Sequence, residues 1–219
     1  MRNPVFNLSN YPSAARIFIA ELRDKNIQQD SMRFRRNLER LAEVLAYEIS
    51  RTFDYREITT ETVLGSSPEI MPLQQPVLVA VLRAALPFHT GFLNIFDRAE
   101  NAFIGAYRSA HKSDHSFDVQ MDYMACPDLE GKTIILIDPM LATGKSLVRT
   151  WEALQKFGKP AKLHVAAAIA SADGIEFVSK AIPEAQIWTG AIDPTLNDHY
   201  YIVPGLGDAG DLAYGQKNS

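Results

Sequence analysis

Four residues that can bind a phosphorylated sugar lie within one short segment, directly after an apolar run. They are Asp138, Thr143, Gly144 and Ser146. The Asp138 carboxylate can accept hydrogen bonds from neighbouring sugar hydroxyls, and Thr143 and Ser146 add hydroxyl donors. Gly144 permits a turn in which the N–H groups of residues 142–146 converge on an anion, and a helix that begins at Ser146 adds partial positive charge. The segment therefore predicts a site for a sugar that bears a phosphate.

Two other interpretations of this segment are open to test from the residues alone. Asp, Thr, Gly and Ser also favour a capped strand-to-helix turn that binds no ligand. The end of the segment, Gly144-Lys-Ser146, also suggests a P-loop. A P-loop needs a glycine five residues before Gly144, and Pro139 stands there with no N–H to donate. The P-loop is thereby excluded, and the phosphate–sugar site remains favoured over the capped turn.

Apolar runs and turn signals elsewhere predict strands that alternate with helices. The run at 77–82 is continuously apolar, as expected for a strand covered on both faces. This alternation predicts an α/β fold with a doubly wound, mostly parallel sheet flanked by helices, in which ligands bind beyond the carboxyl ends of strands. Further strands are expected at 102–107, 132–137, 163–170 and 186–192, and helices at 86–96, 146–157 and 174–180.

The chain is long enough for one well-buried domain, which we expect over 1–219. Its three parts are an N-terminal helical segment at 1–75, a core at 76–192 and a tail at 193–219. An amphipathic helix should begin at Asp30 or Ser31, since apolar residues recur there at helical spacing. The polar segment 109–131 has no clear period and is expected to be a functional loop. The glycines of the tail predict close approach of its backbone to a ligand.

The composition favours a soluble cytoplasmic protein and disfavours nucleic acid and membranes as partners. The net charge of −4 provides no general basic field. Arginines at 33, 35, 36 and 40 could contact RNA, but a solvated helix face or a subunit contact is the favoured interpretation. Cys126 is the only cysteine, which indicates a reducing compartment. The N-terminus has no apolar signal-peptide core, and no apolar run approaches the roughly 20 residues that span a bilayer.

Two long motifs of the chain resemble those of uracil phosphoribosyltransferases, a group of type I phosphoribosyltransferases. Asp138-Pro-Met-Leu-Ala-Thr-Gly-Lys-Ser146 is similar to their motif for phosphoribosyl diphosphate (PRPP), and residues 201–211 are similar to their uracil-binding tail. Residues 82–86 and the pair Tyr107-Arg108 resemble two shorter motifs of the family. The order and spacing of the motifs agree from about residue 76 to residue 215.

The resemblance implies a role for each matching residue. Arg83 and Arg108 would hold the pyrophosphate of PRPP, which suits their planar charge. Asp208 would lie beside PRPP, and Asp208 and Arg108 are the candidate catalytic residues. The residues that would contact uracil, mainly through main-chain groups, are Ile202, Gly207, Asp208 and Ala209. The ribose and its 5-phosphate would be held by Asp138, Pro139, Met140, Leu141, Ala142, Thr143, Gly144, Lys145 and Ser146.

The implied reaction transfers the 5-phosphoribosyl group from PRPP to uracil and yields UMP and diphosphate, as in pyrimidine salvage. The implied cofactor is Mg²⁺, carried by PRPP with no direct protein ligand. The family's tail forms a hood over the base, and its mobile lid corresponds to the loop at 109–131. The implied partners are uracil and PRPP, with GTP as a candidate activator. The resemblance also implies a homodimer or a larger homo-oligomer, in which the N-terminal helix is a plausible contact.

Several residues depart from the family's pattern. Ala85 and Pro87 stand where the family has glycines, and Lys145 replaces a further glycine. Leu212 stands where a basic residue is common, and residues 121–124 replace the usual Lys-Leu-Pro stretch of the lid. These departures motivate an alternative function, a non-catalytic regulator that binds PRPP or a pyrimidine on the same fold.

Overall fold

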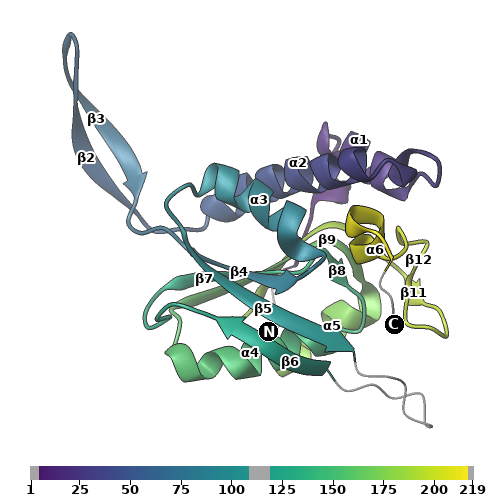
Figure 1. The fold of residues 1–219 in the computed structure, drawn as a ribbon. Coiled ribbons are helices and arrows are strands. Elements are labelled where there is room, and N and C mark those ends of the chain that lie inside the picture. Colours follow the sequence, from purple (N-terminus) through teal and green to yellow (C-terminus); the bar gives the residue numbers. More distant parts are fainter. Residues whose placement is uncertain (1–4, 109–118, 217–219) are drawn as a thin grey trace.

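The computed structural model describes residues 5–108 and 119–216, which form a central sheet covered by helices on both faces (Figure 1). The sheet has eight strands in the order β1-β10-β9-β7-β4-β5-β6, with the short β8 paired to β9. Neighbouring strands are parallel, except that β5 and β6 are antiparallel. The predicted doubly wound, mostly parallel sheet is confirmed. The strands are β1 (Val5–Asn7), β4 (Val77–Leu82), β5 (Glu100–Arg108), β6 (Val119–Ala125), β7 (Thr133–Ile137), β8 (Met140–Leu141), β9 (Lys162–Ser171) and β10 (Gln186–Asp193).

Helices form one layer on each face of the sheet (Figure 1). The first layer contains α1 (Ala15–Arg23), α2 (Ser31–Ser50) and α3 (Ala85–Ile95), and the second contains α4 (Lys145–Leu154) and α5 (Ala172–Ala181). Each layer has its own apolar core against the sheet. Short 3-10 helices lie at Leu8–Asn10, Ile27–Gln29 and Gln155–Phe157. The tail forms the small strands β11 (Thr195–Leu196) and β12 (Ile202–Val203) and the helix α6 (Ala209–Tyr214), which pack on the first layer's core.

The helix α2 forms where its cap and its apolar spacing predict it. The Asp30 side chain accepts the N–H of Arg33 at 3.0 Å and so caps the first turn. Gly91 of α3 lets α2 come close, because a Cβ there would lie 2.1 Å from the carbonyl oxygen of Glu39. The apolar residues at helical spacing are all buried: Phe34, Leu38, Leu41, Leu45 and Ile49.

Two strand-rich regions differ from expectation. The segment expected as a loop at 109–131 contains β6 at the edge of the sheet, while 109–118 lie outside the described residues. Apolar and polar residues alternate over 119–123, the period of an edge strand, but the polar stretch before them hides this short signal. Within 1–75, besides the helices, β1 joins the sheet, and β2 (Tyr55–Thr62) and β3 (Gly65–Pro72) form a hairpin that projects from the body (Figure 1).

Candidate functional site

The sheet changes its winding direction between β4 and β7, and predicted site residues follow both strands. The chain leaves β4 through α3 to β5 on one side, and leaves β7 through α4 to β9 on the other. The two strands are hydrogen-bonded neighbours, and their carboxyl ends lead into Arg83 and Asp138. Open α/β sheets bind ligands at such a switch point. The geometry therefore indicates one site at the carboxyl edge of β4 and β7.

The loop after β7 is held to β9 by backbone hydrogen bonds. The N–H of Asp138 donates to the carbonyl of Ala166 at 3.1 Å, and the carbonyl of Pro139 accepts two N–H groups of β9 at 3.0 Å each. The short strand β8 continues the pairing with β9. The N–H of Met140 donates to Oδ1 of Asp138 at 3.1 Å, which orients the carboxylate. Asp138 is thus a half-buried carboxylate on a rigid turn.

Gly144 makes the turn into α4 possible. Its φ of 75° lies in the left-handed region, which other residues disfavour. A Cβ at this position would lie 2.7 Å from Cγ2 of Val178, so the turn is also packed tightly against α5. Thr143 and Ser146 stand at the start of α4, which begins at Lys145, one residue earlier than predicted. Oγ1 of Thr143 accepts the N–H of Lys145 at 3.4 Å.

Ser171, at the end of β9, connects this loop to α5 through hydrogen bonds. Its Oγ donates to the carbonyl of Ala142 at 2.6 Å and accepts the N–H of Gly174 at 2.8 Å. A Cβ at Gly174 would lie only 2.1 Å from the Ala142 carbonyl oxygen, so the two segments touch through their backbones. The loop from 138 to 144 is therefore held by backbone hydrogen bonds to β9 and by the hydroxyl of Ser171.

The C-terminal tail reaches the loop after β4. Nη2 of Arg83 lies 3.5 Å from Oδ1 of Asp211, and both side chains are partly open to solvent. A Cβ at Gly210 would lie 3.9 Å from Cβ of Ala84. Residues 210–211 of the tail and residues 83–84 are therefore in contact, although they lie far apart in the sequence.

Asp208 caps the helix of the tail. Its Oδ1 accepts the N–H groups of Gly210 at 2.8 Å and of Asp211 at 3.0 Å. Gly207, directly before it, has a φ of 92° and so permits a turn that a side chain would strain. The side chains of Ile202 and Ala209 are buried, so a ligand would meet these residues through main-chain groups.

The predicted site residues fall into three groups in the structure. Arg83 and Asp138 follow adjacent strands, and the tail residues around Asp208 lie beside Arg83. Pro139 and Leu141 have buried side chains and serve packing within the loop. Arg108 closes β5, but its side chain lies outside what the structure describes.

The sequence patterns did not predict which residues hold the tail. Asp211 faces Arg83, Asp193 binds a turn of the tail, and Arg23 and Arg35 bind tail carbonyls. A signal existed for Asp193, because it ends β10 at the same edge as Asp138, where polar residues are expected. No local signal marks Arg23, and the arginine cluster that includes Arg35 was interpreted as a solvated face or a subunit contact, because both partners lie far along the chain.

The arginines of α2 have partners within the protein. Arg33 makes a two-bond pair with Glu21 at 2.9 and 3.0 Å, and its hydrogen bonds, with one from Asn37, lower the pKa of Glu21. Arg36 pairs with Glu39, and Arg40 lies 5.5 Å from the ring centre of Phe18. The cluster is therefore tied to helix packing and to the tail.

The buried histidine His164 lies away from this edge, near the amino end of β9. Its Nδ1 accepts the indole N–H of Trp188 at 3.1 Å. Burial, with a smaller contribution from the charge of Lys162, lowers the pKa of His164 to about 4. A neutral imidazole in the core suits packing rather than chemistry at the site.

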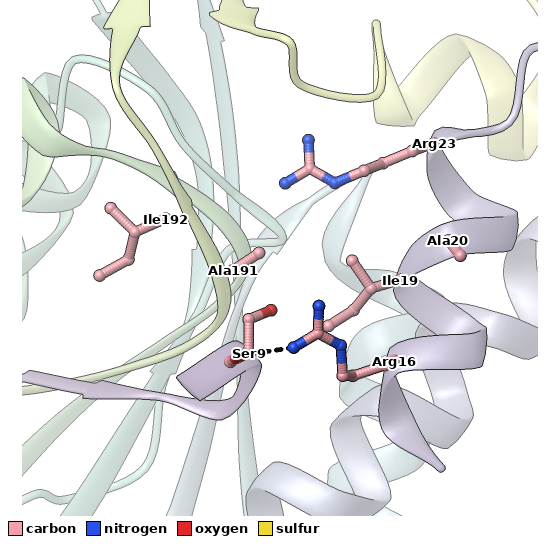
Figure 2. A pocket seen from close by; sticks show the side chains of 7 residues that line it. All are labelled: Ser9, Arg16, Ile19, Ala20, Arg23, Ala191 and Ile192. Carbon is pink, nitrogen blue, oxygen red and sulfur yellow. Dashed lines mark hydrogen bonds between the residues drawn. The ribbon is translucent and has the colours of Figure 1, made fainter. Parts of the chain in front are cut away.

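A cavity of about 310 Å³ opens between α1, the first 3-10 helix and β10 (Figure 2). None of its lining residues is among the predicted site residues. It is lined by Ser9, Arg16, Ile19, Ala20, Arg23, Ala191 and Ile192.

Residues 11–216 match the family model of uracil phosphoribosyltransferase. The chain belongs to the uracil phosphoribosyltransferase family. This membership confirms the resemblance of the motifs. The family is one of transferases. Two relatives named uracil phosphoribosyltransferase agree over nearly the whole chain. The one from Porphyromonas gingivalis is 48% identical over 214 residues, covering 97% of this chain and 99% of the relative. The one from Pyrococcus furiosus is 37% identical over 215 residues, covering 97% and 90%.

A solved structure has the same fold as this family member. The AQ2163 protein from Aquifex aeolicus superposes with a TM-score of 0.86 at 29% sequence identity, covering 98% of this chain and 100% of that one. Over the ranges 5–108 and 119–216, no helix is long and apolar enough to cross a membrane. Within the same described residues, no three His, Cys, Asp or Glu side chains group together as metal ligands.

Proposed function

We propose that the protein transfers the 5-phosphoribosyl group of PRPP to uracil, forming UMP and releasing diphosphate. The observation that carries the proposal is the meeting of two segments at one edge of the sheet. The loop after β4 touches the glycine-rich tail through Arg83 and Asp211, and β4 adjoins β7, which leads into Asp138. A sugar–phosphate loop and a turn suited to a base therefore lie side by side. Membership of the family supports the same reaction.

On the donor side, the segment 138–146 binds the sugar and its 5-phosphate. The oriented carboxylate of Asp138 accepts hydrogen bonds from the ribose hydroxyls. The hydroxyls of Thr143 and Ser146 and the amides at the start of α4 donate to the phosphate. Arg83 and Arg108 neutralise the diphosphate.

On the acceptor side, main-chain groups of residues 202–209 bind uracil. The edge of uracil alternates C=O and N–H groups, which a bent backbone segment can complement, and Gly207 lets that backbone approach. Cytosine would present a donor where uracil has an acceptor, which costs about 1–3 kcal/mol when the site's own polar groups stay unpaired.

The transfer needs positioning and charge stabilisation more than acid–base chemistry. The bond from C1′ of the ribose to the diphosphate oxygen breaks, and its electron pair leaves with the diphosphate. N1 of uracil forms the new bond to C1′ as its N1–H bond breaks, and the proton passes to solvent water. Arg83 and Arg108 stabilise the negative charge that gathers on the leaving group, and Asp208 fixes the start of α6 beside it.

Mg²⁺ fits this site as a companion of PRPP rather than as a resident of a protein cage. In the described part of the chain, carboxylates such as Asp138 and Asp208 do not join a group of three that could hold a metal ion. The ion's ligands would therefore be mainly oxygen atoms of PRPP, with Asp208 at the rim. When bound, Mg²⁺ neutralises charge on the diphosphate.

The test is a UMP-forming assay with labelled uracil, PRPP and Mg²⁺. We expect UMP and diphosphate in equal amounts, with little product from cytosine, hypoxanthine or orotate. Omitting PRPP should abolish the product. If the folded protein forms no UMP while calorimetry detects PRPP binding, the enzymatic proposal fails.

Self-association, cytoplasmic location and a salvage role are part of the proposal. The hairpin β2–β3 supports self-association, because its tip residues Val63 and Leu64 are 99% and 98% exposed. Large apolar side chains on a projecting arm are typical of contact surfaces. Light scattering on the wild-type protein and on a Val63→Ser, Leu64→Ser variant tests this. We expect a dimer or a larger assembly for the wild type and a smaller species for the variant.

Adding GTP to the UMP-forming assay tests whether GTP is an activator.

A further inference from the structure

An ion pair between α1 and β10 forms hydrogen bonds with both backbone polar groups of one tail residue, Gly205. Arg23, the last residue of α1, donates from Nη1 and Nη2 to the two carboxylate oxygens of Asp193 at 2.8 and 2.7 Å. The same Nη1 donates to the carbonyl of Gly205 at 3.0 Å, and the N–H of Gly205 donates to Oδ2 of Asp193 at 2.9 Å. Both backbone polar groups of Gly205 are therefore held by one ion pair.

Gly205 lies in the middle of the proposed base-binding segment. Gly205 lies between Ile202 and Gly207, and its φ of 57° is left-handed. A Cβ there would lie 2.1 Å from the carbonyl oxygen of Ile202, so the turn is closed as tightly as a glycine permits. Fixing both peptide groups of Gly205 sets the direction in which the chain continues to Gly207 and Asp208.

The ion pair is not an ordinary surface contact. Asp193 is buried with 5% exposure, whereas exposed pairs of this kind contribute little. Removing the arginine would leave a buried carboxylate without its cation, and removing the carboxylate would leave the N–H of Gly205 without its acceptor. The geometry of the turn therefore depends on both partners.

Figure 2 supplies a matched control on the same helix. Arg16 and Arg23 both line the cavity beside α1, one near each end of the helix. Arg16 donates to the carbonyl of Ser9 at 2.9 Å and lies outside the tail's hydrogen-bond network. Both arginines lie on α1, line the same cavity and carry the same charge, but only Arg23 donates to Gly205.

We propose that Arg23 and Asp193 are positioning residues for the pyrimidine base, acting through the backbone of Gly205. The inference rests on the proposed function, because it assigns uracil to the segment around Gly205. The PRPP loop is held by Ser171 and β9 instead, so the two substrates should respond differently to loss of the pair.

The test compares Arg23→Met with Arg16→Met in steady-state kinetics with both substrates varied. For Arg23→Met we expect the KM for uracil to rise about tenfold or more, with the KM for PRPP changed less than twofold. Arg16→Met should leave both KM values near those of the wild type. Hydrogen exchange of the amides at 203 and 205–208 should quicken in Arg23→Met only.

Two further variants cover the case in which Arg23→Met does not fold. Arg23→Lys keeps the charge but loses the two-bonded geometry, and Asp193→Asn keeps one acceptor for Gly205; each should raise the KM for uracil about threefold or more. An active, folded Arg23 or Asp193 variant with an unchanged KM for uracil overturns the positioning role alone. A wild-type protein that forms no UMP overturns the proposed function and, with it, the role in base binding.

Discussion

The two halves of the site are built by different means. The loop from 138 to 144 is attached to its neighbours by backbone hydrogen bonds to β9 and by the neutral hydroxyl of Ser171. Over its described residues, 193–216, the tail has only the two-residue strands β11 and β12 for strand pairing, and it is tied to the body by arginines of α1 and α2. The first half therefore rests on the sheet itself, and the second combines apolar packing with charged side chains from the N-terminal layer.

This difference has a physical consequence for how each half can fail. Backbone pairing inside a sheet survives the loss of single side chains, but it tolerates no added atoms where chains touch. A segment held by charged side chains loosens when one partner is removed. Changes in the loop should therefore alter PRPP use, and changes in the N-terminal arginines should alter uracil use.

The largest expected effect follows from replacing the loop's carboxylate. Asp138→Asn keeps the size of the side chain but removes the charge that strengthens hydrogen bonds to the ribose hydroxyls. Each such bond contributes about 1.5–3 kcal/mol, so kcat/KM for PRPP should fall about 100-fold or more. The KM for uracil should change little. Steady-state kinetics with each substrate varied measures both quantities.

The control for this change is a carboxylate at the other end of the strand. Asp128 is exposed before β7 and accepts the N–H of Glu130 at 3.2 Å. Asp128→Asn should leave kcat/KM unchanged. Equal losses in the two variants would mean that Asp138 acts through general electrostatics rather than through contact with the sugar.

The loop could be predicted from the sequence because its signals are local. An apolar strand, a carboxylate, a left-handed glycine and a helix start follow one another within a few residues, and each has a known conformational preference. The strands β4 and β7 and the cap at Asp30 were predicted from the same kind of signal. Where the signal was short or weak, as in β6 and the β2–β3 hairpin, the prediction failed.

The support of the tail could not be predicted, because its contacts join distant parts of the chain. Arg23 and Asp193 are 170 positions apart, and Arg35 and Ala213 are 178 apart. Nothing in the periodicity of α2 separates Arg35, which binds the tail, from Arg36, which pairs with Glu39. The packing of α1 and α2 over the tail decides these partners, and packing is set by the whole fold.

A fall in pH should weaken the N-terminal layer that supports the tail. His164 lies in the core next to Phe53 and Trp188 and has a folded-state pKa of about 4, against about 6.5 when unfolded. Between these values the unfolded chain binds a proton that the folded chain does not. The free energy of unfolding should therefore fall by about 3 kcal/mol from this group as pH drops from 6.5 to 4.

Urea unfolding at several pH values measures this contribution. His164→Asn keeps an acceptor for the Trp188 indole. It should remove the contribution of His164 to the pH dependence of the free energy of unfolding. The matched variant His199→Asn, at an exposed position of the tail, should keep the wild-type dependence. The same pH dependence in the wild type and in His164→Asn would contradict the assignment.

Two left-handed glycines allow the packing of the loop to be tested separately from its backbone strain. Gly144 and Gly131 have similar φ values of 75° and 67°, but a Cβ lies 2.7 Å from Val178 at the first and meets nothing within 4 Å at the second. Gly144→Ala should therefore lower the free energy of unfolding by about 2 kcal/mol more than Gly131→Ala. It should also raise the KM for PRPP. Equal losses of unfolding free energy in the two variants would show that α5 moves to make room for the added methyl group. The loop would then be less rigid than its contacts indicate.

The smallest expected effect concerns the second arginine that binds the tail. Nη1 of Arg35 donates to the carbonyl of Ala213 at 2.7 Å, and its guanidinium carbon lies 5.9 Å from the ring centre of Tyr214. Arg35→Met removes one charged hydrogen bond at the far end of α6, so the KM for uracil should rise about fivefold while the KM for PRPP stays unchanged. Arg36→Met, one residue along the same helix, removes pairs with Glu39 and Glu43, neither of which lies in the tail, and should leave both values unchanged. A rise in the KM for PRPP instead would mean that α6 supports the diphosphate through Arg83 and Asp211, and the two halves of the site would then be mechanically joined.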